Sequence, residues 1–282
     1  MTKPVLLLSF VLVCAPAIQA QQERGSDAAP IVLANDKLQL AIGTTGGRFS
    51  KIVLRDEEQL SPLAAIGHFL ALDGFGAPSD QERALGMPFH GEASRQPVKI
   101  IAMRDSGPMR LITMQSVLPL AQETLTRTVE AADGENIIYV TSRLESALTV
   151  DRPVSWAEHA TIGPPFMQAG RVVVDMPASN CRVRSYKPGT IPGRLVYNHD
   201  FKWPMAPTND GGHADLRIIP TDHNWLDLAS CQMDPGRRFA FVTVLHLEKH
   251  LVSGYTGDNR RRAGWSSSRA LSLGGICSAS AF

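Results

Sequence analysis

The stretch that most constrains the fold is QETLTRTVEAADGENIIYVTSRLES, at residues 122–146. In its first half Thr124, Thr126 and Thr128 alternate with Leu125, Arg127 and Val129, which is the two-residue period of a half-buried strand. Asp133-Gly134 is a strong turn signal, and residues 137–144 return as a β-branched and aromatic run. The sequence therefore predicts a long antiparallel hairpin.

Similar short extended runs occupy most of the remaining chain. In DKLQLAIG, Leu38, Leu40 and Ile42 fall on one face of a predicted strand, and RFSKIVL follows the Gly46-Gly47 turn as a second strand. Further runs are PVKII (97–101), GRVVVDM (170–176), ADLRIIP (214–220) and RRFAFVTVLHL (237–247). The clearest helix is short, opening at a Ser79 capping box and reaching about Leu85. We expect an all-β fold, a large antiparallel β-sandwich forming one domain.

The two ends of the chain differ from this pattern. Residues 1–20 combine one positive charge, a short apolar run and small residues near Ala20, which is typical of a secretory signal peptide. The alternative is an anchor that stays attached, which the short apolar run disfavours. We expect a flexible leader at 21–30, the sandwich at 31–257 and an irregular or altered tail at 258–282, in a secreted or periplasmic protein.

Charge and cysteine content limit the classes of partner. The chain carries 28 basic and 27 acidic residues, so nothing favours nucleic acid or an anionic surface as a partner. No segment after the signal is apolar enough to span a membrane. Cys181, Cys231 and Cys277 remain beyond the signal; they allow one disulfide, and Cys181–Cys231 is the first pair to test. No spacing indicates a metal site, and we expect no cofactor.

Two histidines stand in unusual local settings. His90 lies in PFHGEASR, beside a glycine where a loop enters a strand, and His159 lies in VSWAEHATIGPPF after Trp156 and Glu158. Loops that combine Trp, His and Glu, held by Gly and Pro, suit sugar binding, because aromatic faces stack on a pyranose while His and Glu bond its hydroxyl groups. The alternative is that each histidine simply bonds a neighbouring backbone group.

Three further polar groups are weaker candidates. His68 lies five residues before Asp73, and the two converge only if the chain bends; we interpret the pair as structural or as part of the rim of a site. TDHNWLDLAS supplies Asp222 and Trp225, either for substrate binding or as a solvated turn. DFKWP (200–204) is similar and weaker. Established nucleophile and phosphate-loop motifs are missing.

Taken together, the GG turn after the first strand, HGEASR and EHATIGPPF resemble the galactose mutarotase-like (aldose 1-epimerase-like) superfamily. The resemblance covers roughly residues 31–256 and implies a supersandwich that binds sugars on a concave face. It implies that His90 and His159 are the catalytic histidines, with His159 as the acid at the ring oxygen. Arg48 is a weaker candidate for a hydroxyl-binding cation.

The carboxylate base is where the chain departs from that superfamily, whose active members carry a glutamate near the C-terminus. Here the last glutamate is Glu248, and an Arg/Ser-rich tail stands where the base is expected; Asp222 is the other candidate. The first hypothesis is an exported sugar-binding protein that interconverts anomers by acid–base catalysis. The second is a carbohydrate-binding or glycan-processing accessory domain without the base, and the third is an unrelated exported sandwich with structural histidines. The oligomeric state stays open.

Overall fold

The computed structural model describes residues 29–184, 193–220, 227–258 and 270–281, with only the backbone described for the last of these ranges. The predicted signal peptide and almost all of the leader lie outside the described residues, as do Asp222 and Trp225. In the part of the chain that is described, no helix is long and apolar enough to cross a membrane.

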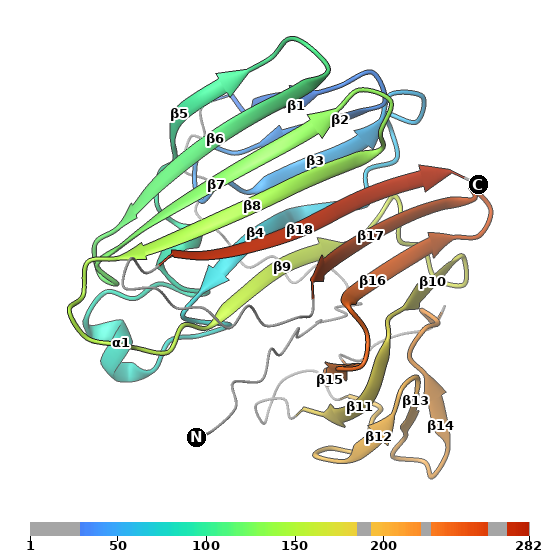
Figure 1. The fold of residues 1–282 in the computed structure, drawn as a ribbon. Coiled ribbons are helices and arrows are strands. Elements are labelled where there is room, and N and C mark those ends of the chain that lie inside the picture. Colours follow the sequence, from blue (N-terminus) through green and yellow to red (C-terminus); the bar gives the residue numbers. More distant parts are fainter. Residues whose placement is uncertain (1–28, 185–192, 221–226, 259–269, 282) are drawn as a thin grey trace.

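Two antiparallel sheets form a sandwich, as the sequence predicts (Figure 1). The five-stranded sheet has the order β1-β2-β3-β4-β9, and the eight-stranded sheet has the order β10-β16-β17-β18-β8-β7-β6-β5. The strands of the first are β1 (Ile31–Ala34), β2 (Leu38–Ile42), β3 (Phe49–Leu54), β4 (Leu63–Leu72) and β9 (Trp156–Ile162). Those of the second are β5 (Lys99–Arg104), β6 (Met109–Leu118), β7 (Glu123–Ala132), β8 (Ile137–Ser146), β10 (Val172–Asp175), β16 (Phe239–His246), β17 (Leu251–Asp258) and β18 (Ala270–Ala281).

Local sequence signals explain several of these elements. The predicted hairpin is confirmed as β7 and β8, with Gly134 at φ +80° in the turn, and the inward positions of β7 are buried as the alternation requires. Helix α1 (Asp80–Ala84) opens on the complete Ser79–Glu82 capping box. A 3₁₀ turn, η1 (Glu92–Ser94), follows it.

The main core lies between the two sheets. Leu38, Leu40 and Ile42, predicted to share one face, are all fully buried there, together with Ile112 and Val129 of the facing sheet. Burial of this apolar surface is the principal stabilising contribution to the sandwich.

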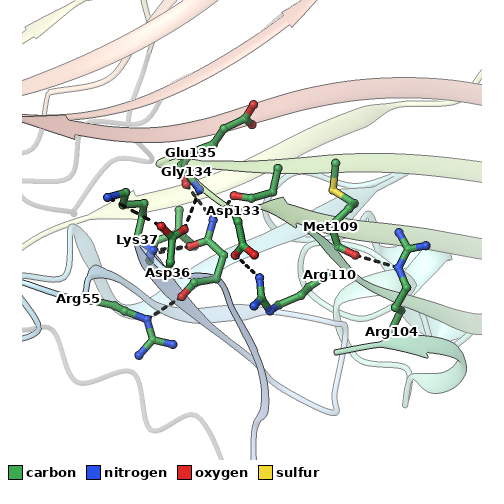
Figure 2. A network of polar contacts seen from close by, with 12 residues as sticks. Asp36, Lys37, Arg55, Arg104, Met109, Arg110, Asp133, Gly134 and Glu135 are labelled. Carbon is green, nitrogen blue, oxygen red and sulfur yellow. Dashed lines mark hydrogen bonds and ion pairs between the residues drawn. The ribbon is translucent and has the colours of Figure 1, made fainter. Parts of the chain in front are cut away.

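A polar network also joins the two sheets at one end (Figure 2). The side chain of Asn35, 1% exposed, donates to the carbonyls of Ala132 and Glu135 and accepts from the backbone N–H groups of Lys37 and Leu38. Since these bonds connect the β1–β2 turn with the β7–β8 turn, they fix the position of one sheet over the other.

A third, smaller sheet was not predicted. Its five strands form a lobe next to the sandwich (Figure 1), in the order β14-β13-β12-β11-β15. They are β11 (Ala178–Val183), β12 (Asp200–Lys202), β13 (Met205–Pro207), β14 (His213–Asp215) and β15 (Ala229–Met233). A disulfide joins Cys181 of β11 to Cys231 of β15, which is the pair that the sequence put first.

The C-terminal region differs from the expectation of an irregular tail. The backbone of β18 pairs with β17 on one side and with β8 on the other, inside the eight-stranded sheet. Small residues and serine lack the alternation from which strands are predicted, so this pairing is visible only from the neighbouring strands.

Candidate functional site

The pairing of β4 with β9 decides where the predicted site residues point. Phe69 lies opposite His159, and Leu70 lies opposite Glu158. Because side chains alternate along a strand, Phe69 and His159 share one face of the five-stranded sheet, while Glu158 and Trp156 share the other. The latter face is turned toward the eight-stranded sheet.

His90 reaches the same place as His159 through the loop that follows α1. Its backbone has φ +66°, and Gly91 has φ +78°, where a Cβ would lie 1.9 Å from the carbonyl oxygen of Leu72. Glycine is therefore required beside His90. The backbone N–H of Gly76 donates to Nδ1 of His90 at 3.1 Å, so the neutral imidazole carries its proton on Nε2.

The two histidines predicted from the sequence lie side by side. Their ring centroids are 5.0 Å apart with an interplanar angle of 69°. Three phenylalanines surround them: Phe69 and Phe75 stack on His159 at 4.7 and 5.3 Å, and Phe89 meets His90 edge-on at 4.2 Å. We call these five residues the histidine cluster.

Part of the histidine cluster faces solvent. Phe75 is 40% exposed and Phe89 is 50% exposed, whereas Phe69 is buried beneath them. The cluster lies at the end of the sandwich where β4 ends, β9 begins and α1 is attached (Figure 1). Exposed aromatic faces beside imidazole groups are a combination that suits a ligand with both C–H faces and hydroxyl groups.

Burial controls the charge of both histidines. It lowers the pKa of His90 from 6.5 to about 4, and the charges of His159 and Arg95 act in the same direction. Burial also lowers the pKa of His159; a backbone hydrogen bond opposes this change and the charge of His68 adds to it. Both imidazoles are therefore mostly neutral at pH 7, a form that can donate one hydrogen bond and accept another.

Three of the other candidates form a separate network with Arg127 on the opposite face of the sheet. Glu158 bonds Nε2 of His68 at 2.8 Å and a guanidinium nitrogen of Arg127 at 3.0 and 3.1 Å, and the indole N–H of Trp156 donates to it at 3.3 Å. We call His68, Arg127, Trp156 and Glu158 the Glu158 network. His68 and Arg127 are buried, whereas the side chain of Glu158 is 35% exposed.

The Glu158 network holds its carboxylate ionised. Burial acts to raise the pKa of Glu158, but the charge of Arg127 and the hydrogen bond and charge of His68 outweigh it and bring the pKa to about 2. A carboxylate with so low a pKa and its oxygens bonded to Arg127, His68 and Trp156 is a poor proton acceptor. Glu158 points between the two sheets, where His68 also contacts Phe49 and Tyr255 edge-on.

His90, His159, Trp156 and Glu158 were expected to serve one sugar site, and the structure places the first two on one face of the sheet and the last two on the other. His68 and Asp73 do not converge: His68 bonds Glu158, whereas Asp73 pairs with Arg152. The physical reason is strand alternation, which sends adjacent residues to opposite faces. Arg48 packs against Gly67: the Cγ of Arg48 lies 3.3 Å from the point where a Cβ on Gly67 would stand.

Of the two candidate bases, Glu248 is the described one, and it does not supply a carboxylate to the histidine cluster. Glu248 lies in the β16–β17 turn, where it forms an exposed ion pair with Arg171 at 2.8 Å. Asp222 is outside the described residues. Among the residues that are described, no hydrogen bond or ion pair joins a carboxylate to His90 or His159, and no three His, Cys, Asp or Glu side chains are arranged to hold a metal.

Sequence reasoning missed the three phenylalanines and Arg127. Arg127 had a visible signal, because it occupies an inward position between Leu125 and Val129, where a charge requires a buried partner. Phe75 and Phe89 lie in loops, and nothing in their spacing indicates that both contact the histidines.

No protein-family model matches this chain, and no curated protein matches its sequence. Among solved structures, HI1317 is matched at 10% identity with a TM-score of 0.53, over 88% of this chain and 91% of that chain. A candidate aldose 1-epimerase from Klebsiella pneumoniae is matched at 13% identity with a TM-score of 0.51, over 88% of this chain and 69% of that chain. A galactose mutarotase related enzyme from Lactobacillus acidophilus is matched at 10% identity with a TM-score of 0.48, over 89% and 97%.

The Klebsiella pneumoniae match shows that the chain has an aldose 1-epimerase-like β-sandwich fold, and HI1317 shares this fold at a similar TM-score. The resemblance seen in the sequence is therefore confirmed for the fold. At such low identity the matches carry over no site residues and no activity.

Proposed function

We propose that this protein binds a sugar at the histidine cluster, and that it does so without converting the sugar. The observation that carries the proposal is the meeting of His90 and His159, 5.0 Å apart, beside the exposed rings of Phe75 and Phe89. Residues 69, 75, 89, 90 and 159 come from separate parts of the chain, and the fold gathers them on one outer surface.

Each part of the cluster has a counterpart in a pyranose. The phenylalanine faces pack against the C–H groups of the sugar ring. Nε2–H of neutral His90 is available to donate to a hydroxyl, since its Nδ1 accepts from Gly76. Burial around His159 strengthens any hydrogen bond that it makes to the ligand.

Two features favour binding over turnover. Mutarotation requires a proton donor at the ring oxygen and a carboxylate base opposite it. The lowered pKa values leave both histidines deprotonated at neutral pH, so neither carries an imidazolium proton to give to the ring oxygen, and the described residues bring no carboxylate to them.

Sugar binding is tested by titrating glucose, galactose and a neutral oligosaccharide into the purified protein and following heat or ligand NMR signals. Phe75→Ala and Phe89→Ala should each weaken binding by about five- to tenfold, since each removes a stacking face. Phe239→Ala is the matched control, because Phe239 is 46% exposed but lies on β16. Equal losses in all three variants, or no binding by the unaltered protein, would refute the proposal.

Anomer interconversion is the second candidate, favoured by the fold shared with a candidate aldose 1-epimerase. Polarimetry of freshly dissolved α-glucose or α-galactose distinguishes it from binding. An acceleration by the unaltered protein that disappears in His159→Ala would establish turnover, and equal rates with and without protein exclude it for these sugars.

We also propose that the protein is exported, on the basis of the pattern at residues 1–20. A mature N-terminus near residue 21, determined by mass spectrometry after secretion into the periplasm or medium, supports this proposal. An intact Met1 on protein recovered from the cytoplasm contradicts it.

A further inference from the structure

Across its strands β11, β12 and β15, the smaller sheet presents a face of polar side chains, with the exposed Met205 of β13 at its edge beside Lys202. Its central strand, β11, pairs with β12 on one side and β15 on the other, so that side chains form rows across the three strands. One row is Lys202, Asn180 and Gln232, and the next is Asp200, Arg182 and Ser230. Arg184 continues the same face just past the end of β11, where its N–H still bonds the carbonyl of Leu228.

The apolar residues of these strands point the other way. Cys181, Val183, Phe201 and Cys231 are buried in the core of the small lobe, and the Cys181–Cys231 disulfide ties β11 to β15 directly beneath the polar rows. The polar face is hollowed into a groove of about 630 Å³, lined by side chains and backbone of β11, β12 and β15. The disulfide thus cross-links the two strands that form the floor of the groove, and the groove is already formed without a ligand.

The charges along the groove are unequal. Arg182 forms a bidentate pair with Asp200, with nitrogen–oxygen distances of 2.5 and 2.8 Å, and these two charges largely cancel. Among the described residues, the ammonium group of Lys202 donates a hydrogen bond only to the uncharged side-chain oxygen of Asn180. Arg184 has no ion-pair partner within the described ranges. Two cations therefore remain to meet an anionic ligand.

We propose that this groove binds a carboxylated oligosaccharide. The ammonium of Lys202 and the guanidinium of Arg184 meet carboxylate groups on the sugar chain, and guanidinium is suited to bidentate carboxylate recognition. Asn180, Gln232 and Ser230 lie between and beside these cations and offer both donors and acceptors, which neighbouring sugar hydroxyls require.

The composition of the groove distinguishes this ligand from other polyanions. Single-stranded nucleic acid binds through aromatic rings that stack on bases, and the aromatic residue of these strands, Phe201, is 8% exposed and belongs to the core. An acidic peptide usually adds apolar contacts, and the apolar residues of the three strands face away from the groove. The site is on a different lobe from the histidine cluster and does not depend on sugar binding there.

The test is calorimetric titration of the full chain with a tetramer of galacturonic acid at low and at physiological salt. The double variant Arg184→Ala/Lys202→Ala should lose affinity for the tetramer by a factor of about ten or more. Lys99→Ala/Arg104→Ala is the control that matches its charge loss, because both residues are exposed on edge strand β5 of the eight-stranded sheet. Phe75→Ala should bind the tetramer as the unaltered protein does.

Two further ligands separate sugar recognition from simple charge attraction. A neutral maltotetraose should bind the groove weakly or not at all, and a short poly-glutamate should bind less tightly than the galacturonate chain. Equal affinity for poly-glutamate, equal weakening by the β5 control, or no binding of galacturonate by the unaltered protein would overturn the proposal. Gln232→Ala keeps the charge of the groove, and an unchanged affinity in this variant would likewise refute direct recognition of the sugar.

Discussion

Glu158 and His159 are neighbours in the sequence, yet their side chains leave β9 on opposite faces of the five-stranded sheet. Glu158 turns inward to Arg127 and His68, and His159 turns outward to His90 and Phe69. One strand thus supports a buried ionic network on one side and an aromatic, partly exposed surface on the other. A change at either residue affects a different property of the protein.

Arg127→Met should lower the free energy of unfolding by about 2 kcal/mol, because it leaves the Glu158 carboxylate without its main cation; the partial exposure of Glu158 keeps the loss below that of a fully buried pair. Arg143→Met is the control, since Arg143 pairs with Glu145 on the surface of the neighbouring strand β8, and a loss under about 1 kcal/mol is expected there. Urea unfolding of both variants measures the difference. Similar losses would show that the Glu158 network does not stabilise the sandwich.

The stability of the protein should fall in acid partly through His90. Its pKa is about 4 in the folded protein and near 6.5 when unperturbed, so the unfolded chain takes up the proton more readily. The contribution is complete above pH 6.5 and is lost as the pH falls toward about 4. Urea unfolding at several pH values should show a shallower decline in His90→Gln than in the unaltered protein. Parallel declines would mean that the His90 pKa is not depressed.

Gly91→Ala should disturb the loop that carries His90. Both Gly91 and Gly86 have a positive φ, which strains any residue with a Cβ. A Cβ at Gly91 would also lie 1.9 Å from the carbonyl oxygen of Leu72, whereas nothing lies within 4 Å of a Cβ at Gly86. Gly86→Ala therefore reports the backbone strain alone, about 1 kcal/mol. The Gly91 variant should lose more stability in urea and should also weaken sugar binding, which Gly86→Ala leaves nearly unchanged. Equal behaviour of the two variants would contradict the close packing of Gly91 on β4.

Replacing both cysteines, in Cys181→Ala/Cys231→Ala, should destabilise the small lobe. The disulfide closes a loop of 50 residues, for which the chain-entropy account gives about 4 kcal/mol. Hydrogen exchange should show lost protection at β11 and β15, with β7 and β8 much less affected. Uniform loss of protection across both lobes would show that they unfold as one cooperative unit.

The elements that the sequence predicted correctly are those whose signals are local. The Asp133-Gly134 turn, the Ser79 capping box and the alternation of Leu38, Leu40 and Ile42 each involve residues within a few positions of one another. Alternation also identified which residues of β7 point inward.

The division of the site into two clusters depends on pairing between distant strands. Whether Glu158 and His159 share a pocket is decided by the register of β9 against β4, ninety residues earlier, and by which face of that pair meets β7. Phe75 and Phe89 join the cluster only because loops at the end of the sandwich fold over β4. The small lobe was missed for a related reason, since three of its five strands are only three residues long.

Because the Cys181–Cys231 disulfide lies beneath the polar groove, the affinity measured for the groove depends on whether the expression host allows this disulfide to form. A reducing cytosol keeps thiols apart, so recombinant protein made there carries a loosened small sheet beside an intact sandwich. Such a preparation passes a test of overall folding and still presents an altered groove. Material oxidised in a periplasm or an endoplasmic reticulum carries the floor that the groove requires.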